Sequence, residues 1–430
     1  MSGDNRQKVL VIGPALTLSG YGEQCRFALR SLRTLEDQYD IYLHATNWGN
    51  TGWIHDDNEE REWIDSILHK TVVYTQQGGQ FDISLQVTIP NEWKKIAPIN
   101  VGYTAGIETT LVAPQWLEKC REMDRIIVVS NHSKEVYEST TYGVMNEQTK
   151  ERIGTLKCEV PIKTVNYPVK DTSTADPADL DLNLSTDFNF LCVAQWGPRK
   201  NVHNTIEWFI EEFHDEEDVG LALKVFHMNT SNIDREFVVK QLKNMLNDYP
   251  DRKCKIHLLH GHMTEDEMHA IYKHPQIKGL VTLTHGEGYG LPLFEAAYCG
   301  LPVVAPAWSG HMDFLMAPSN SKKSDKLRPH FLKVDYALGE VPQEVLWEGV
   351  IQQGSQWAEP HEASYKKQLR DLKKNHSRHQ GTANRLQKHI LKNFTPEKMY
   401  SEFCEAFAGE QSLDIDAWLT ELESGVEEHE

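Results

Sequence analysis

The sequence HGEGYGLPLFEAAYCGLPVVAP, residues 285 to 306, joins a glycine-rich segment to an apolar one. The run GLVTLT before it, residues 279 to 284, predicts a strand. Leu291 to Cys299 has the composition of a helix, with Pro292 suited to its first turn and Gly300 to its end. A strand, a glycine loop and a helix in this order bring backbone N–H groups to a helix N-terminus. We therefore expect an anion-binding loop suited to a phosphate.

Two glutamates flank this loop. Glu295 falls early in the predicted helix, where its carboxylate can accept hydrogen bonds from two neighbouring hydroxyls, such as those of a ribose. Glu287 falls in the loop itself and could accept from the hydroxyls of a second ring. Gly288 and Gly290 would let the backbone approach a ligand closely. A glutamate near a helix N-terminus also stabilises the helix without a ligand, so these residues alone leave a structural role open.

Strands and helices alternate along most of the chain. The first strand is KVLVIG, residues 8 to 13, and the later strand candidates of the first half are YDIYLHA, FDISLQV, INVGYTA and DRIIVVS. After a polar stretch, residues 169 to 187, a second series follows: FNFLCVAQWG, GLALKVFHM, KCKIHLLHG, KGLVTLTHG and LPVVAPAW. This alternation predicts two doubly wound α/β halves joined by a linker.

The pattern E-x7-E after a strand, with HGEGYGLPLFEA and LPVVAP, closely resembles the retaining glycosyltransferases of the GT-B fold, family GT4. The resemblance covers most of the second half. It implies an α/β protein with two Rossmann-like doubly wound domains that face an inter-domain cleft. The implied division is residues 1–170 for an acceptor-side domain, 171–187 for a linker, and 188–390 for a nucleotide-sugar-binding domain. Residues 391–430 would form C-terminal helices that pack back on the N-terminal domain, followed by an acidic tail.

The resemblance also implies roles for residues in and near this loop. Glu287 would lie beside the donor sugar, and Glu295 would hold the nucleotide ribose. His262 and Met263, in the loop after KCKIHLLHG, would lie beside the base. The backbone expected to meet the diphosphate comprises Gly288, Tyr289, Gly290 and Leu291.

A second motif is AQWGPRKNVHNTIEWF, residues 194 to 209, where Arg199 and Lys200 follow a strand at a turn. Two cations there could neutralise a diphosphate leaving group, although a solvated turn carries such residues equally well. The family places a phosphate-binding arginine and lysine on this turn. Lys200 matches the lysine. The usual arginine position holds Gln195, which makes Arg199 the candidate to replace it.

Two motifs of the first half complete the implied site. In SGYGEQCRF, Gly20 and Gly22 match a family loop that faces the donor phosphates and the acceptor. The loop is not GxGxxG, so a nicotinamide cofactor is not favoured. In GYTAGIETT, many relatives carry a histidine where this chain has Thr104 or the next residue, which leaves the catalytic detail open. Thr104 and Glu108 are the candidate acceptor contacts, with a surface glutamate as the alternative for Glu108.

Residue types that bind metals occur, but their positions do not predict a metal site. In KCKIHLLHGHM they alternate along a predicted strand and cannot all converge; they are Cys254, His257, His260 and His262. Two DxD sequences, residues 179–181 and 414–416, fall in the predicted linker and tail. Retaining GT-B enzymes do not generally need that motif. We expect no metal and no required cofactor, with a nucleotide-diphosphate sugar, UDP- or GDP-linked by preference, as the donor substrate.

The charge balance limits the partners. The 430 residues include 44 Lys and Arg against 63 Asp and Glu, a formal charge of −19. Such a chain does not coat nucleic acid or an anionic membrane with its whole surface. A local basic run, residues 366–392, predicts a solvated helical face and leaves a phosphate-rich acceptor, including DNA, open. A second one comprises Lys322, Lys323, Lys326 and Arg328.

The chain reads as a cytoplasmic protein. Its seven cysteines form no CxxC pair, which fits a reducing compartment. The N-terminal apolar run is too short for a signal peptide, and no apolar stretch is long enough to span a bilayer.

The implied reaction is retaining glycosyl transfer to a hydroxyl acceptor, which could be a glycan, a lipid or a small molecule. A retaining glycosidase needs two close carboxylates, whereas here only Glu287 is placed by the sugar. We therefore expect a front-face displacement in which Lys200 and Arg199 hold the departing diphosphate. Three alternatives stay open: transfer to a hydroxymethylated DNA base, a sugar-nucleotide epimerase, and a non-catalytic sugar-nucleotide sensor.

Overall fold

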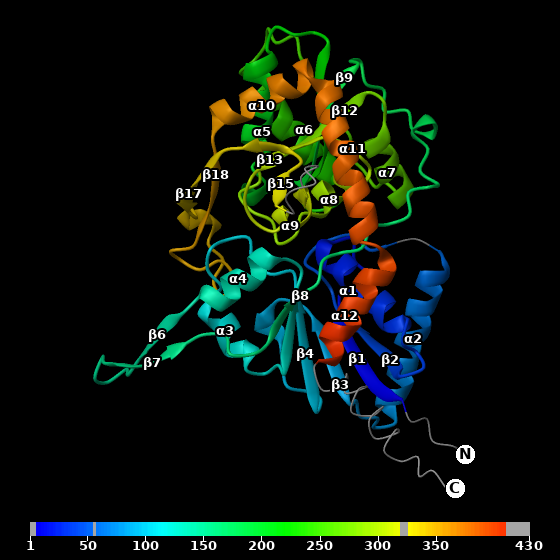
Figure 1. The fold of residues 1–430 in the computed structure, drawn as a ribbon, viewed down its shortest axis with the longest axis vertical. Coiled ribbons are helices and arrows are strands. Elements are labelled where there is room, and N and C mark those ends of the chain that lie inside the picture. The colour runs from blue at the N-terminus through cyan, green and yellow to red at the C-terminus, as the bar shows by residue number, and fades with distance from the viewer. Residues whose placement is uncertain (1–5, 55–56, 319–325, 410–430) are drawn as a thin grey trace, which may run out of the picture.

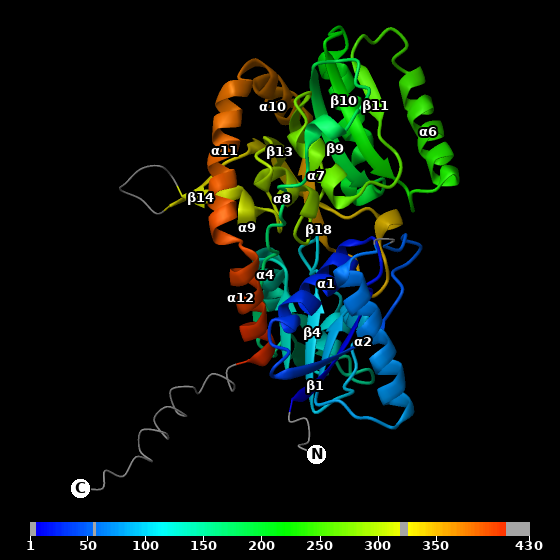
Figure 2. The same ribbon diagram turned by 90° about the vertical axis from the view of Figure 1, so that its right-hand side faces the viewer.

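The computed structural model describes residues 6–54, 57–318 and 326–409. The chain forms two lobes, each built on a six-stranded parallel sheet with helices against its faces (Figures 1 and 2). The N-lobe lies at the bottom of Figure 1 and the C-lobe at the top.

The N-lobe sheet has the strand order β2-β1-β3-β4-β5-β8. Its strands are β1 (Gln7–Gly13), β2 (Tyr39–Ala45), β3 (Ile83–Val87), β4 (Ile99–Thr104), β5 (Arg125–Val128) and β8 (Ile162–Thr164). Its helices are α1 (Gly20–Arg33), α2 (Glu59–Gln76), α3 (Pro114–Cys120) and α4 (Asn131–Ser139). An exposed hairpin, β6 (Tyr142–Met145) and β7 (Arg152–Leu156), projects from this lobe (Figure 1). A short 3-10 turn, η1 (Pro90–Glu92), follows β3.

The C-lobe sheet has the order β11-β10-β9-β12-β13-β16. Its strands are β9 (Phe188–Gln195), β10 (Val219–Phe226), β11 (Lys255–Leu258), β12 (Ile277–Val281), β13 (Val303–Pro306) and β16 (Leu332–Val334). Its helices are α5 (Val202–Phe213), α6 (Asn232–Asn247), α7 (Glu265–Lys273), α8 (Leu291–Tyr298), α9 (Met312–Leu315), α10 (Glu362–Lys374) and α11 (His376–Asn393). Counted along the chain, this order is 3-2-1-4-5-6, the doubly wound arrangement in which the winding reverses between the first and fourth strands.

Smaller elements decorate the C-lobe. Two antiparallel pairs are β14 (Met316–Pro318) with β15 (Leu327–Pro329), and β17 (Tyr336–Glu340) with β18 (Gln356–Pro360). The 3-10 turns are η2 (Pro177–Asp179), η3 (Pro198–Lys200) and η4 (Gln343–Val345).

The predicted α/β class and its two doubly wound halves are confirmed. The nine strands predicted beyond KVLVIG all form. Most are apolar runs buried between helices on both faces of a parallel sheet, whereas β11, at the edge of its sheet, is only partly buried. The predicted helix Leu291 to Cys299 is α8, with Cys299 as its C-cap and Gly300 at φ 80° after it. The residue bounds of the domains stay a prediction.

The chain passes between the lobes twice. The first crossing follows β8, and the second lies between α11 and α12 (Pro396–Ala408). The two crossings are adjacent, because the backbone N–H of Val169 donates to the carbonyl of Phe394 at 2.8 Å. Helix α12 then packs along α1 of the N-lobe (Figures 1 and 2). Its Phe403 ring lies 5.4 Å from Phe27, and its Phe407 ring 5.4 Å from Tyr39.

Within the described ranges, the helices are all too short or too polar to cross a lipid bilayer.

Candidate functional site

The two motifs of the C-lobe meet where the winding of its sheet reverses. Arg199 and Lys200 form η3 directly after β9, and the HGEGYG loop follows β12, the neighbouring strand. The backbone N–H of His285 donates to the carbonyl of Arg199 at 2.8 Å, which joins the two loops. The carboxyl ends of parallel strands at such a reversal are where α/β sheets commonly bind ligands.

Arg199, Lys200 and Glu287 form one group of contacts, here called the cation–glutamate cluster. Lys200 Nζ lies 2.6 Å from Glu287 Oε1 and 2.8 Å from Oε2. Arg199 Nη1 lies 3.2 Å from Glu287 Oε2 and donates to the carbonyl of Gly286 at 2.6 Å. The structure thus brings together the three residues that the sequence predicted as catalytic, while their roles stay a prediction.

Burial and charge set the ionisation of this cluster. Burial alone would raise the pKa of Glu287, but Lys200 and Arg199 lower that pKa to about 2. Burial lowers the pKa of Lys200, and Glu287 opposes the shift by stabilising the ammonium group. Glu287 is therefore a carboxylate at neutral pH and can accept hydrogen bonds but cannot donate a proton.

A residue that the sequence did not single out holds the loop in place. Ser309 is a buried non-glycine residue at φ 79°, in the left-handed region, and its Oγ accepts from the backbone N–H of Glu287 at 2.9 Å. Such a conformation costs on the order of 1 kcal/mol or more and persists only where surrounding contacts enforce it. Gly290 at φ 97° makes the last turn before α8, where a glycine is needed.

The glycines of this loop approach the N-lobe closely. A Cβ atom on Gly288 would overlap the carbonyl oxygen of Ala105, and one on Gly286 would overlap the carbonyl oxygen of Glu108. The sequence analysis expected Gly288 to give access to a ligand. In this structure its immediate neighbour is instead the backbone after β4, which lets the two lobes meet at the cation–glutamate cluster.

The glycine loop before α1 reaches the same junction. Ser19 caps α1 by accepting from the backbone N–H of Gly22, and Gly20 is the first residue of the helix. Tyr21, between the two glycines, hydrogen bonds to Thr104 at 2.8 Å and accepts from the N–H of Ala105 at 3.3 Å. Thr104 is fully buried, and its hydroxyl group is in contact with the hydroxyl group of Tyr21. Sequence reasoning missed Tyr21, although an aromatic residue between two loop glycines was a visible signal.

Glu108 crosses from the N-lobe to the cluster. Its Oε1 lies 3.4 Å from Arg199 Nη2, and both side chains are about 30% exposed. The sequence predicted Glu108 as an acceptor contact, with a surface glutamate as the alternative. The observed contact is an ion pair between the lobes, and the acceptor role stays a prediction.

Glu295 lies apart from the cluster, at a cleft of about 800 Å³ between the lobes. Tyr272 of α7 donates to Glu295 Oε2 at 2.8 Å. Burial raises the pKa of Glu295 to about 7, although Lys170 and the Tyr272 hydroxyl act in the opposite direction. The carboxyl is thus balanced between its neutral and charged forms near neutral pH.

The remaining predicted donor residues divide between this cleft and the core. His262 and Met263 line the cleft with Glu295, and their place beside a nucleotide base stays a prediction. Leu291 lines a smaller adjoining pocket that Glu295 shares. Tyr289 is buried, with its ring 4.9 Å from the ring of Tyr167, so only its backbone is placed to meet a ligand.

The metal-type residues of β11 and the following loop have separate partners. His260 Nε2 lies 2.9 Å from Asp234 Oδ2, and His257 Nε2 lies 3.3 Å from Thr186 Oγ1. Of the DxD sequences, Asp181 accepts from the N–H of Asn183 at 2.9 Å, and the one at 414–416 lies outside the described residues. The expectation of a site without metal stays a prediction.

Comparisons identify the fold. No family model matches the sequence, and no curated protein matches it. Among solved structures, sucrose-phosphate synthase from Thermosynechococcus elongatus is similar over 96% of this chain and 100% of that one, with 12% identity and a TM-score of 0.58. The catalytic domain of starch synthase IV from Arabidopsis thaliana, bound to ADP and acarbose, is similar over 94% and 99%, with 11% identity and a TM-score of 0.53.

A third structure, TarM of S. aureus in complex with UDP, fondaparinux and α-GlcNAc-glycerol, shows 14% identity and a TM-score of 0.47. It is matched over 76% of this chain, which spans 55% of its length. The two lobes, their sheets and the similarities over nearly the whole chain define a protein of the GT-B fold.

Proposed function

We propose that the protein is a retaining glycosyltransferase of the GT4 type, which moves a sugar from a nucleotide-diphosphate sugar to a hydroxyl acceptor. The observation that carries this proposal is the cation–glutamate cluster at the reversal point of the C-lobe sheet, together with Glu295 at the cleft between the lobes. Two cations at a loop before a helix N-terminus suit a diphosphate. A half-buried carboxyl at a cleft suits a pair of ribose hydroxyls.

The proposed division of work follows the two lobes. The C-lobe would bind the donor, with His262 and Met263 beside the base and the backbone from Gly288 to Leu291 beside the diphosphate. The N-lobe would shape the acceptor site and contribute Gly20 and Gly22 to the phosphates. UDP and GDP are the favoured nucleotides, while the ADP bound in the starch synthase IV structure adds a third.

The proposed reaction is a front-face displacement. The bond between the anomeric carbon and the diphosphate oxygen breaks, and a bond to the acceptor oxygen forms on the same face of the sugar. The acceptor proton passes to the departing diphosphate. Lys200 and Arg199 would exchange part of their contact with Glu287 for phosphate oxygens, while Glu287, an obligate acceptor, would hold sugar hydroxyls.

The surroundings of Tyr21 favour a sugar-bearing acceptor over DNA. The half-buried Trp48 stacks on Tyr21, with ring centroids 4.0 Å apart, and aromatic faces suit the apolar faces of sugar rings. Three basic residues of α10 are paired with carboxylates, which lowers the positive charge that this helix offers to DNA. Lys366 lies 2.6 Å from Glu211, Arg370 lies 2.9 Å from Glu212, and Lys373 lies 3.1 Å from Asp218.

The test is a panel of UDP-, GDP-, ADP- and dTDP-sugars, with thermal shift and release of nucleoside diphosphate as the readouts. We expect one donor to stabilise the protein and to be hydrolysed slowly without an acceptor. Conversion of a donor to an isomer without diphosphate release would favour an epimerase. Binding with neither product would favour a sensor, and an absence of binding across the panel would contradict the proposal.

A further inference from the structure

Lys170 occupies the hinge between the lobes. It follows Val169, whose backbone N–H bonds the carbonyl of Phe394, so it lies where the two crossings of the chain touch. Its side chain is 23% exposed and lines the same cleft as Glu295. Backbone segments at such crossings are where lobe motions are absorbed in two-lobed proteins.

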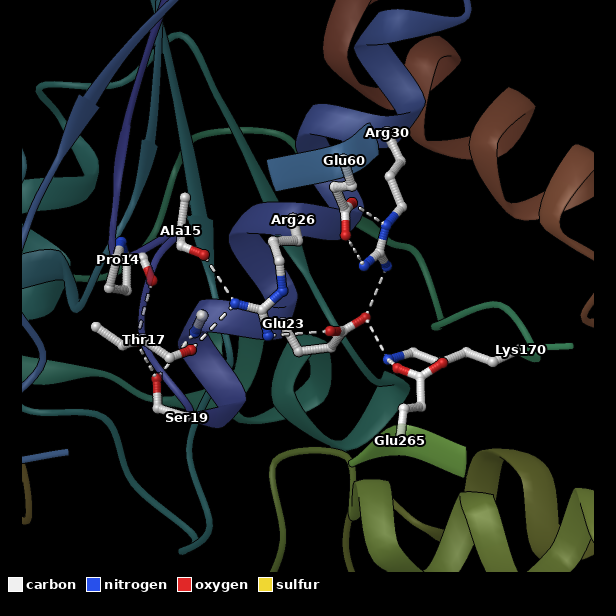
Figure 3. Close-up of polar contacts among 11 residues, drawn as sticks. Pro14, Ala15, Thr17, Ser19, Glu23, Arg26, Arg30, Glu60, Lys170 and Glu265 are labelled. Carbon is white, nitrogen blue, oxygen red and sulfur yellow. Dashed lines mark hydrogen bonds and ion pairs between the residues drawn. The ribbon is translucent and has the colours of Figure 1, made fainter. Parts of the chain in front are cut away.

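The ammonium group of Lys170 contacts both lobes at once. Its Nζ lies 3.2 Å from Glu23 Oε1 on α1 of the N-lobe and 2.5 Å from Glu265 Oε2 at the start of α7 in the C-lobe. Figure 3 shows the lysine between the two carboxylates. Here this arrangement is called the Lys170 bridge.

Glu23 extends the bridge to the glycine loop. Its Oε2 accepts from Arg26 Nη2 at 3.1 Å, and Arg26 Nη1 donates to the carbonyls of Ala15 at 2.7 Å and Thr17 at 3.0 Å (Figure 3). Arg26 is buried, so its two carbonyl contacts fix the path of the chain directly before Gly20. The contacts therefore run without a break from the first turn of α7 to the loop proposed to face the donor phosphates.

The charges of this network balance within the N-lobe without Lys170. Glu23 is also paired with Arg30, at 2.8 Å, and Arg30 binds Glu60 at 2.5 Å (Figure 3). Loss of the lysine would leave Glu23 with two arginines, while Glu265, whose side chain is 54% exposed, would be solvated. Removing the ammonium group would thus break this one ion-pair link between the lobes, beside the Glu108–Arg199 pair that remains, without leaving a buried charge unpaired.

We propose that Lys170 is a positioning residue that, together with the other contacts between the lobes, sets the angle between them and, through Glu23 and Arg26, the shape of the glycine loop, so that donor affinity depends on this bridge. The part concerning the donor rests on the function proposed above. The part concerning the angle does not, because it follows from the contacts of Lys170 alone.

The test compares Lys170→Ala, Lys170→Arg and Glu265→Gln in the full chain. Lys134→Ala is the control, because Lys134 pairs with Glu138 at 3.7 Å within α4 alone. Small-angle X-ray scattering should show a larger radius of gyration for Lys170→Ala and Glu265→Gln than for the control. Lys170→Arg, which keeps a cation able to reach both carboxylates, should restore the compact profile.

The second readout is the donor identified by the nucleotide-sugar panel. The KM for that donor should rise at least about fivefold in Lys170→Ala, the lower end of coupling between separate sites, with kcat at saturating donor close to that of the unmodified protein. Lys170→Arg should bring the KM for the donor back close to that of the unmodified protein.

The outcomes separate the two proposals. Scattering curves of Lys170→Ala and Glu265→Gln that match the Lys134→Ala control would overturn the positioning role, whatever the protein binds. An absence of nucleotide binding in the unmodified protein would contradict the proposed function, and scattering would still decide the role of the bridge. If Lys170→Ala fails to fold by circular dichroism, Glu265→Gln decides alone, since it removes only the contact to the C-lobe.

Discussion

Lys200 Nζ lies within 2.8 Å of both carboxylate oxygens of Glu287, across 87 positions of sequence. This pair joins the loop after β9 to the loop after β12, and Arg199 completes it from the same turn as Lys200. In the proposed function, a diphosphate at this site would meet two cations held close together, which would exchange part of their carboxylate contacts for phosphate oxygens.

Replacing Lys200 tests this arrangement directly. We expect Lys200→Ala to lower kcat by about 10²-fold or more, the usual effect of losing one charged group that stabilises a leaving group. The control is Lys134→Ala, and circular dichroism checks that the fold survives. Unchanged turnover in a folded Lys200→Ala protein would remove the proposed role.

Glu295 should make donor binding depend on pH. Burial, with smaller contributions from Glu265 and Glu23, raises the pKa of its carboxyl to about 7 against the opposing influence of Lys170 and Tyr272. Only the carboxylate accepts from both ribose hydroxyls, so the affinity for nucleoside diphosphate should fall as pH falls below about 7. Calorimetric titration at several pH values should show a steeper slope for the unmodified protein than for Glu295→Gln, in which the terminal phosphate of the ligand still titrates. A slope of the same size in both would count against the ribose role.

The same carboxyl should affect stability with a defined sign. A carboxyl whose folded pKa is raised from 4.5 to about 7 contributes stability below its usual pKa, and that contribution is lost as pH rises through about 7. The glutamine side chain of Glu295→Gln does not ionise, so the variant does not lose this stability as pH rises. Its melting temperature relative to the unmodified protein should therefore increase from about pH 5 to about pH 8 in thermal melts without ligand. A difference that stays constant with pH would show that the pKa of Glu295 is not raised.

Glu108 competes with any anion for Arg199. The two side chains are 3.4 Å apart and partly exposed, and a diphosphate would have to share or displace the glutamate. We expect Glu108→Gln to tighten nucleoside diphosphate binding by a few-fold, the effect of one partly screened charge. Equilibrium binding at low and high salt measures it. Weaker binding in the variant would indicate that Glu108 holds Arg199 in place and does not compete with the ligand.

Gly288 controls how closely the lobes approach. A methyl group there would overlap the Ala105 carbonyl, so Gly288→Ala should separate the loop from β4, lower the melting temperature and raise the KM for donor. Gly154→Ala is the matched control, because the nearest atom to its new methyl group, Val144 Cβ, is 4.0 Å away. Equal melting temperatures and KM values in the two variants would show that the contact is easily relieved.

The sequence predicted the features that form within a single lobe. Apolar runs marked the strands, and the loop with Glu287 and the turn with Lys200 each follow a strand as expected. The structure adds that these two strands are neighbours. Contacts between lobes left no such signal. The pairing of Glu108 with Arg199 depends on how two sheets dock, which no periodicity encodes. The left-handed backbone of Ser309 likewise occurs at a residue type that does not favour it, so it could be found only in three dimensions.

The packing of α12 on α1 makes the N-lobe depend on both ends of the described chain. A protease nick in the segment between β8 and β9 would sever only one of two connections, and the fragments should still migrate together on a sizing column. A fragment that stops after β8 would instead leave Phe27 and Tyr39 without their α12 neighbours. The exposed apolar surface would make such a fragment prone to aggregation. An isolated N-lobe for ligand studies should therefore be made as a graft that joins β8 to α12 through a short spacer.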